Sequence, residues 1–457
     1  MIDAGMPPPA TLLPGEQWRR LHPLSPLVRV GAVIAAVPFL LVGSFSGGRQ
    51  SQDGGRPNIT VLIWSGLAIL GLIGGFVSWL VTRWRIDQGD LQIERGLIRR
   101  QSFRIPLERI QAIDVIAPLT ARILGLAEVR VISAGRGLEH GRLAYLSAAE
   151  APVVRAQLLA LAHGLAATTP EPPGYRLARV DNGRLAMGLL TRASVIVPGM
   201  LLFGAIVAAM VRPANASFTA VAVTGGLAFQ SVVVTARRFN DDYNFSIAEA
   251  GDGLRLDRGL LQQRHETIPF TRIQAVRLVE PLLWRLFGWC RLDVDVARQR
   301  VSHEADRDAN RVARTLIPVA SRDLVVWLLS RVMPAVTSEP PAGSSSPRRA
   351  RLRAPLSYHF LAAWNDDRYV CARTGRLQSA TVVVPVDKVQ SVRLASGPVQ
   401  RALRLATVHV DTAGRRWQAA ARCRDEGDAD ALLWTIAERA RDARRQRSTA
   451  AGAQKQS

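Results

Sequence analysis

The chain has 457 residues and a formal net charge of +22, and 48% of its residues are hydrophobic. This length allows about three domains together with membrane segments. Arginine supplies almost all of the positive charge and is spread over the whole chain. That distribution argues against nucleic-acid binding and fits the anionic cytoplasmic face of a membrane. Cys290, Cys371 and Cys423 stand far apart, so the sequence predicts neither disulfides nor a zinc site.

Four long apolar runs without charged residues predict two transmembrane hairpins, because a spanning helix needs about twenty apolar residues. The last three runs are long enough, and the first becomes so when Leu27 and Val28 are included. Arginines flank the hairpins and are scarce in their turns, so the positive-inside rule places both termini in the cytoplasm. The runs are Val30–Phe45, Ile59–Val81, Ala193–Val211 and Phe218–Ala236. The residues that we expect at the membrane interface are Arg83, Arg85, Arg237 and Arg238.

A seven-residue pattern occurs three times, as Ile105–Gln111, Ile268–Gln274 and Val384–Gln390. Each copy has a glycine ten residues before its proline and an arginine eleven residues after its glutamine. Such fixed spacings identify internal repeats. The glycines are Gly96, Gly259 and Gly375, and the arginines are Arg122, Arg285 and Arg401.

Within each repeat, alternating apolar and polar residues predict short strands, and the glycine is expected to turn a hairpin between two of them. The proline falls at a strand end, where a missing amide proton does little harm. A single helical turn follows, ended by Gly125 in the first repeat and by Gly288 in the second. Each repeat finishes with an amphipathic helix. The repeat is therefore predicted to be a small, strongly bent antiparallel sheet closed by a C-terminal helix.

This order of elements, with I-P-x-x-R-I-Q at the end of a strand and R-x-x-G after the next one, resembles the bacterial pleckstrin-homology (PH) domain. Such domains alternate with transmembrane hairpins in some membrane proteins. The resemblance covers about residues 20 to 445, and it implies a multi-pass protein of the bacterial inner membrane. Arg404 stands where the other repeats have glycine, so we expect the third repeat to turn differently there.

The predicted fold class is membrane α-helical hairpins plus α+β, with three PH-like domains. The predicted segments follow in chain order. They are a cytoplasmic N-terminal segment (1–26), transmembrane hairpin 1 (27–81), PH-like domain 1 (82–163), a linker (164–189), transmembrane hairpin 2 (190–236), PH-like domain 2 (237–334), a Ser/Pro/Arg-rich linker (335–355), PH-like domain 3 (356–445) and a disordered tail (446–457).

Candidate chemistry is sparse. Gly135-Arg136-Gly137 lacks the spacing of a phosphate loop, and His265-Glu266 lacks the second histidine of a zinc protease. Asp241-Asp242 and Asp366-Asp367 would suit a cation but are interpreted as solvated turn residues. We therefore predict no catalytic residues, no metal site and no cofactor. Six recurring cations are candidates for an anion-binding face, with fold organisation as the alternative: Arg109, Arg272, Lys388, Arg122, Arg285 and Arg401.

The sequence thus predicts a non-enzymatic membrane protein that presents three PH-like domains as an interaction platform. The expected partners are membrane lipids, an unidentified protein, and a second copy or a sister PH-domain membrane protein, but not nucleic acid. A role in cell-envelope defence is implied by the resemblance alone. The alternative is a component of a transport or efflux system that uses the four helices. Ion-coupled transport usually needs ionisable residues inside the membrane, and the four runs contain none.

Overall fold

The computed structural model describes most of the chain, in two compact units that are treated separately below. Unit 1 comprises residues 1–174 and 261–267, and unit 2 comprises residues 175–260 and 268–457. Most of the predicted first hairpin lies outside the described residues, and so do the glycines at 135 and 137. The described residues are 18–25, 28, 66, 70, 73, 74, 76, 77, 79–87, 89–96, 101–133, 141–166, 169, 174–211, 215–251, 253–297, 314–336, 339–355, 357–414 and 417–454.

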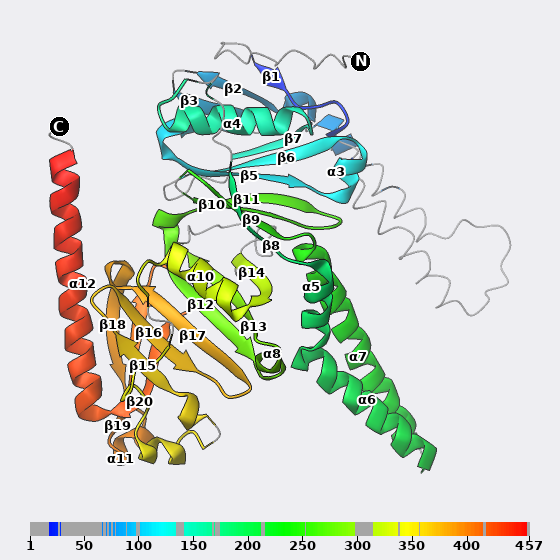
Figure 1. Cartoon of the computed structure of the whole chain (residues 1–457). Helices are drawn as coiled ribbons and strands as arrows, with labels where there is room; N and C mark the ends of the chain where they lie inside the picture. The colour runs from blue at the N-terminus through cyan, green and yellow to red at the C-terminus, as the bar shows by residue number, and fades with distance from the viewer. Residues whose placement is uncertain are drawn as a thin grey trace, which may run out of the picture. The chain divides into compact units, whose positions relative to one another are not determined.

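Unit 1 contains the first repeat, built as two antiparallel sheets with a helix against them (Figure 1). One sheet has the order β1-β2-β3-β4, and in the other β5 pairs with β6 and β6 with β7. Helix α4 contributes Ala151, Val154 and Leu158 to the core between them, which also holds Leu91 and Ile113. The elements are β1 (Arg19–Arg20), β2 (Arg83–Asp87), β3 (Asp90–Arg95), β4 (Gln101–Pro106), η1 (Leu107–Arg109), β5 (Ile110–Ala117), α3 (Leu119–Ile123), β6 (Leu126–Ser133), β7 (Gly141–Ser147) and α4 (Glu150–Ala162).

Unit 2 begins with the segment that leads into two long apolar helices, α6 and α7, which lie side by side (Figure 1). Both are long and apolar enough to cross a membrane, and the most apolar stretch of each is unburied. The second repeat follows them. These elements are β8 (Tyr175–Arg179), α5 (Asn182–Leu190), α6 (Ala193–Val211), α7 (Asn215–Asp242), β9 (Ser246–Ala250), β10 (Gly253–Arg258), β11 (Gln263–Pro269), η2 (Phe270–Arg272), β12 (Ile273–Pro281), α8 (Leu282–Leu286), β13 (Trp289–Val296), β14 (Arg314–Ser321) and α10 (Arg322–Val332). Residues 263–267 of β11 belong to unit 1.

The third repeat has the same element order but no membrane hairpin before it. Helix α12, red in Figure 1, packs against β18, β19 and β20. The elements are η4 (Arg348–Leu352), η5 (Tyr358–Phe360), β15 (Ala362–Asn365), β16 (Tyr369–Thr374), β17 (Gln378–Pro385), η6 (Val386–Lys388), β18 (Val389–Ala395), α11 (Pro398–Ala402), β19 (Leu405–Thr412), β20 (Ala419–Asp425) and α12 (Glu426–Gln454).

The recurring sequence pattern marks a β-bulge in every repeat. In the second repeat Ile273 lies opposite Val296 and Ala275 opposite Asp295, so Gln274 is an extra residue between them. The equivalent ladders shift register at the same place, between Ile110 and Ala112 and between Val389 and Ser391. A bulge bends its strand and increases the local twist, which suits a small sheet that must fold over its own core. Each pattern's proline is the last residue of its strand, as the sequence predicts.

Glycine recurs where the backbone is left-handed. Gly96, Gly259 and Gly375 turn the hairpins at φ of 96°, 109° and 94°, which confirms their predicted role. After the short helix of each repeat, Gly125 and Gly288 are also left-handed, and so is Arg404 at φ 49°. The expectation that the third repeat turns differently at Arg404 is therefore wrong. The backbone keeps the same turn although a Cβ makes this conformation cost about 1 kcal/mol.

Sheets are shared between successive repeats. In unit 1, Gln263, Arg264 and His265 of β11 pair with β5 of the first repeat. In unit 2, β17 of the third repeat pairs with β12 of the second, along six residue pairs from Val276↔Val383 to Pro281↔Gln378. The six-stranded sheet β14-β13-β12-β17-β16-β15 thus serves two repeats. Strands β12 and β17 each send side chains into both cores that this sheet separates.

The predicted linkers contain ordered elements. Segment 164–189 carries β8 and most of α5, and segment 335–355 carries η4 and a bridge from Ser345 to Ala362. Ser344, Ser346 and Ala350 are buried, so the second linker packs against its domain although its composition is that of a flexible chain. Helix α12 runs on to Gln454, so the predicted disordered tail is helical up to that residue. A boundary drawn from composition alone misses segments that are ordered by contacts with distant strands.

Candidate functional site

A β-ladder joins the strands that flank each of the two segments predicted to be hairpins. In unit 1, β1 precedes the first hairpin segment and β2 follows it, and the two pair through Arg19↔Trp84 and Arg20↔Arg83. In unit 2, β8 precedes helices α6 and α7 and β9 follows them, and this pair runs from Tyr175↔Glu249 to Arg179↔Ser246. We call these pairs the first clamp (Arg19–Arg20 with Arg83–Asp87) and the second clamp (Tyr175–Arg179 with Ser246–Ala250). Each clamp holds both ends of a hairpin segment on the first sheet of its repeat.

Aromatic and arginine side chains reinforce the first clamp. The indole Nε1 of Trp79 donates to the carbonyl oxygen of Leu21 at 2.9 Å, which joins the end of the hairpin to the strand before it. The guanidinium groups of Arg83 and Arg85 lie 4.8 and 4.6 Å from the ring centroid of Trp18. Cation–π contacts of this kind are worth about 0.5–1 kcal/mol at exposed sites. Arg83 and Arg85, two of the four arginines predicted at the membrane interface, thus have a structural role in the first clamp, and their place at an interface stays a prediction.

The second clamp is extended by helix α5, which is seated on a buried tryptophan. Trp284 of α8 is fully buried, and its Nε1 donates to the Gly188 carbonyl oxygen at 3.1 Å and to Thr191 Oγ1 at 3.0 Å. A Cβ on Gly188 would lie 2.7 Å from Val319 Cγ2 and 3.2 Å from the Trp284 ring. Glycine is therefore required where α5 crosses the sheet of the second repeat. This seat fixes the chain just before α6 begins.

Arg192 lies at the entry to α6, close to the charged side chains of Arg291 and Asp242. Its guanidinium carbon is 5.5 Å from the Trp284 ring centroid. Burial, reinforced by the nearby charge of Arg291, lowers the pKa of Arg192 to about 10. The group remains a cation at neutral pH, and the aromatic face of Trp284 offsets part of the cost of burying it.

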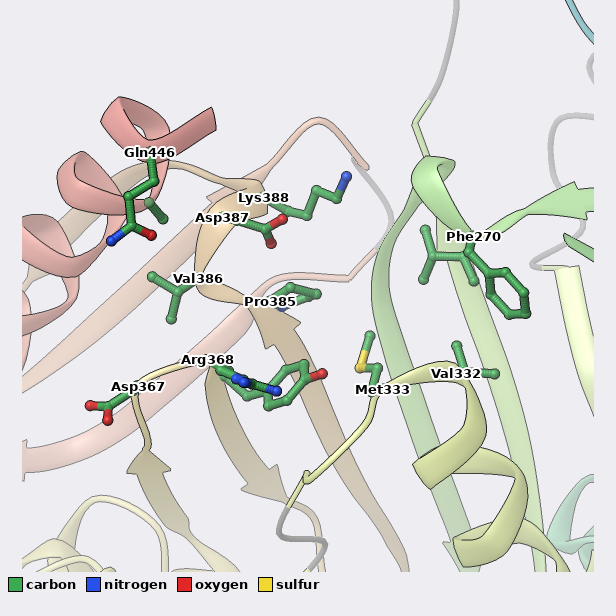
Figure 2. Close-up of a pocket in the computed structure, with 13 residues that line it drawn as sticks. Phe270, Val332, Met333, Asp367, Arg368, Pro385, Val386, Asp387, Lys388 and Gln446 are labelled. Atoms are coloured by element: carbon green, nitrogen blue, oxygen red, sulfur yellow. The ribbon is translucent and has the colours of Figure 1, made fainter. Parts of the chain in front are cut away.

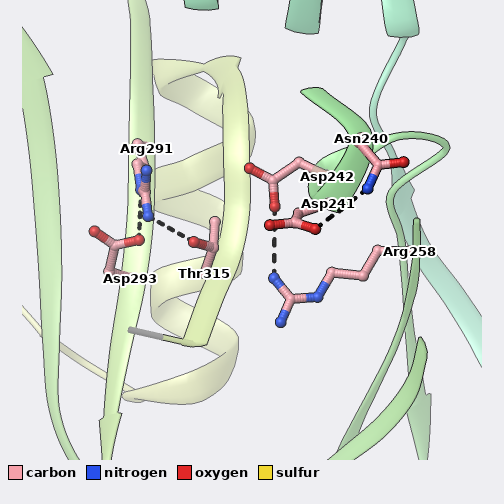
Figure 3. A network of polar contacts seen from close by, with 7 residues as sticks. All are labelled: Asn240, Asp241, Asp242, Arg258, Arg291, Asp293 and Thr315. Atoms are coloured by element: carbon pink, nitrogen blue, oxygen red, sulfur yellow. Dashed lines mark hydrogen bonds and ion pairs between the residues drawn. The ribbon is translucent and has the colours of Figure 1, made fainter. Parts of the chain in front are cut away.

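The end of α7 is fixed by a buried ion pair (Figure 3). Asp242 is buried at the last position of α7, and its Oδ1 accepts from Arg258 Nη1 of β10 at 3.5 Å. Nearby, Arg291 donates to Asp293 Oδ1 at 2.5 Å and to Thr315 Oγ1 at 2.6 Å, which ties β13 to β14. Removing one partner of a buried ion pair leaves an uncompensated charge, at a cost of about 3–5 kcal/mol. The exit from α7, like the entry to α6, is thus joined to the second repeat by buried polar contacts.

The two pairs of neighbouring aspartates, Asp241-Asp242 and Asp366-Asp367, do not all behave as solvated turn residues. Asp241 is exposed, whereas Asp242 is buried, so the interpretation of both as solvated turn residues is wrong for Asp242. The turn interpretation is confirmed for Asp366, whose Oδ1 accepts from the backbone N–H groups of Arg368 and Tyr369. Among the described residues, no group of three or more His, Cys, Asp or Glu side chains could hold a metal ion.

Three of the six recurring cations reach backbone carbonyls. Arg272 donates to the Ala297 oxygen at 3.1 Å, Arg285 to the Arg376 oxygen at 3.1 Å, and Lys388 to the Thr271 oxygen at 2.8 Å. The last two contacts join the second repeat to the third. These contacts are the ones expected if the recurring cations organise the fold.

The other recurring cations lie on the surface and are not gathered into one site by any described contact. Arg109, Arg122 and Arg401 are exposed. Anion binding by the set of six stays a prediction. Arg237 and Arg238 are exposed near the end of α7, and their place at a membrane interface also stays a prediction.

A hollow of about 360 Å³ lies in unit 2 where the second and third repeats meet (Figure 2). Phe270, Met333 and Val386 supply apolar walls. Its charged lining residues are balanced in sign, because Asp367 and Asp387 accompany Arg368 and Lys388. Burial lowers the pKa of Lys388. This balance gives the hollow no preference for anions over cations, so it does not define an anion-binding site.

These observations define a membrane-associated class of protein in which repeated, sheet-rich domains are joined to long apolar helices. The bacterial PH domain family matches residues 28–162, 193–322 and 323–440. These regions cover most of the chain, so the protein belongs to the bacterial PH domain family. The second region includes helices α6 and α7, and the third region contains no such pair among its described residues.

One relative supports the membrane assignment. The chain is 22% identical over 380 residues to the UPF0699 transmembrane protein YdbT of Bacillus subtilis (strain 168), across 75% of this chain and 73% of the relative. No solved structure matches the chain. The family and this relative indicate a membrane-associated role, and they suggest that this role is non-catalytic.

Proposed function

We propose that the protein is a membrane-held interaction platform that presents three cytoplasmic PH-like domains to proteins or lipid headgroups. The observation that carries this proposal is the second clamp, because both ends of the α6–α7 pair are bound into the sheet of the second repeat. The second repeat in turn shares a sheet with the third. A protein built in this way holds its domains at a fixed place beside the membrane, which is what a docking platform requires.

The proposed arrangement is a multi-pass protein of the bacterial inner membrane, with four membrane helices and both termini in the cytoplasm. It follows from the arginine distribution and from the absence of charged residues in the four apolar runs. Anionic lipid would attract Arg83, Arg85, Arg237 and Arg238 with about 1 kcal/mol per residue near the surface. A role in cell-envelope defence rests on resemblance alone. Transport by the four helices is the alternative, and it is disfavoured by the lack of ionisable residues within the runs.

The topology is tested by labelling single introduced cysteines in intact cells. We expect Ser51→Cys and Asn215→Cys, in the predicted outer loops, to react with a membrane-impermeant thiol reagent. Ser345→Cys should react only after lysis, because the second linker is predicted to be cytoplasmic. The native cysteines do not compete, because all three are buried. Labelling of Ser345→Cys in intact cells would place the third repeat outside the cytoplasm and contradict the proposed topology.

The platform role is tested by exchanging the membrane part and keeping the PH-like domains. Residues 195–232 would be replaced by an unrelated apolar hairpin, which leaves helix α5 and the Asp242–Arg258 pair in place. Proteins that co-purify with the native chain from detergent-solubilised membranes should also co-purify with this chimera. A matched variant would keep the native hairpin and carry charge reversals on exposed surfaces of the PH-like domains. The platform proposal is wrong if partner proteins are lost from the chimera but are still captured by the charge-reversal variant, because the helices would then carry the function.

A further inference from the structure

The two places where repeats share a sheet use the same strand pair. At each junction, the strand that begins with the β-bulge in one repeat pairs with the strand that ends at the proline of the next repeat. In unit 1 these strands are β5 and β11, and in unit 2 they are β12 and β17. Both pairings are antiparallel.

The register of the two junctions is also the same. Ile116 lies opposite Arg264 in the first junction, and the equivalent Val279 lies opposite Ala380 in the second. One residue earlier, Val115 faces His265 and the equivalent Leu278 faces Thr381. A slip of one residue would turn every side chain to the other face of the sheet. Two independent junctions in one register therefore indicate a built-in mode of association between repeats.

In the first and in the last repeat, one of the two strands that form such a junction has no junction partner among the described residues. Strand β18 is the third-repeat equivalent of β5 and β12, and within the described part of the chain it pairs only with β19. Strand β4 is the first-repeat equivalent of β11 and β17, and among the described residues it pairs only with β3. Most of β18 is exposed, including Leu394 at 41%, and Gln101, Ser102 and Arg104 of β4 are exposed as well. Exposed sheet edges of this kind are templates for strand addition.

We propose that β18 of one molecule pairs with β4 of a second copy of this chain, in the register of the internal junctions. That register places Leu394 opposite Ser102 and Ala395 opposite Gln101 of the second copy. The contact is heterologous, because different surfaces meet, so it links copies head to tail. The proposal deepens the proposed function and rests on it, since it names a second copy as one partner of the platform.

The test uses two differently tagged full-length copies in the same membrane, one carrying Leu394→Cys and the other Ser102→Cys. Directly opposed residues of an antiparallel pair lie within the Cα separation that a disulfide accepts. The native cysteines stay in place, because burial raises the pKa of Cys290 to about 12 and also raises that of Cys371. We expect mild oxidation to give a cross-linked species that carries both tags. The matched control pairs Arg393→Cys with Ser102→Cys, which the proposed register turns to opposite faces of the sheet.

A second variant separates strand pairing from random collision. Leu394→Lys places a charge on an exposed edge and should abolish the equivalent cross-link between Ala395→Cys and Gln101→Cys, whereas Leu394→Thr should preserve it. Cross-linking equal to the control pair, or unaffected by Leu394→Lys, would overturn the strand proposal. Capture of other proteins by the hairpin chimera is measured separately. If the strand cross-link is absent, retained capture by the chimera would show that only the second-copy partner had been wrongly assigned, and lost capture would show that the platform role itself is wrong.

Discussion

Replacing Ile273 by aspartate should prevent unit 2 from folding stably. Ile273 is 4% exposed, begins the bulged strand β12 and packs in the core that joins the second repeat to the third. A buried carboxylate without a partner would cost on the order of 4 kcal/mol, which is a large share of the stability of a small domain. The expected result is protease sensitivity of both repeats, because they share the sheet that contains β12. Limited proteolysis and thermal unfolding of the detergent-solubilised protein measure it.

Three matched substitutions make that result specific. Ile273→Val should cost only about 1 kcal/mol, since it removes one methyl group. Leu377→Asp should change stability by less than about 0.5 kcal/mol, because Leu377 is 72% exposed in the β16–β17 turn. Ile110→Asp should be milder than Ile273→Asp, because the equivalent Ile110 is only partly buried. Native protease resistance in Ile273→Asp would show that the register of β12 is wrong.

Replacing Trp284 by alanine should free helix α5 from the second repeat. The side chain is fully buried in the unit 2 core and donates to Gly188 and Thr191. Truncating a buried tryptophan to alanine costs about 3–5 kcal/mol. Because α5 leads directly into α6, the loss should appear first at the membrane end of the repeat. The expected result is faster backbone hydrogen exchange in Asn182–Leu190 and a lower Tm.

The controls for Trp284 separate volume from hydrogen bonding. Trp284→Phe keeps much of the ring volume and loses the N–H donor, so it should cost about 1 kcal/mol from hydrogen bonding. Trp434→Ala removes a tryptophan that is 60% exposed on α12, and its effect should stay below about 0.5 kcal/mol. If Trp284→Ala left exchange in α5 at the level of Trp434→Ala, the seat on Trp284 would not hold the hairpin.

The repeats could be predicted from the sequence because their signals are local and regularly spaced. Proline at a strand end, glycine in a left-handed turn and a short helix before Gly125 or Gly288 each have a backbone cause, and each is found as predicted. The amphipathic helix predicted at the end of the third repeat is found as α12, although it runs on to Gln454 through the segment predicted to be a disordered tail. Arg404 is the exception, because the surrounding elements impose the turn even without glycine.

The clamps and the shared sheets could not be predicted in this way. Arg19–Arg20 is too short to show an alternating pattern, and Tyr175–Arg179 does not alternate strictly. Both pair with strands, β2 and β9, that lie far along the chain. Similarly, nothing near β12 in the sequence indicates that its partner is β17, about a hundred residues later. The spacing of Asp242 and Arg258 gives no signal of a buried pair either. One feature of the sequence could have indicated the clamps. The two ends of a hairpin lie close together, so the segments that flank it are favourably placed to pair as strands.

The most direct measurement maps where bound proteins touch the chain in its native membrane. A tagged full-length protein would be cross-linked in isolated membranes, and the cross-linked residues would be identified by mass spectrometry. If the protein is a cytoplasmic platform, cross-links to other molecules should fall on the sheets and helices of the PH-like domains and depend on an intact second clamp, so that Trp284→Ala reduces them and Trp434→Ala does not. Cross-links confined to helices α6 and α7, with the PH-like domains unmarked, would contradict a platform role and favour a function carried by the membrane helices.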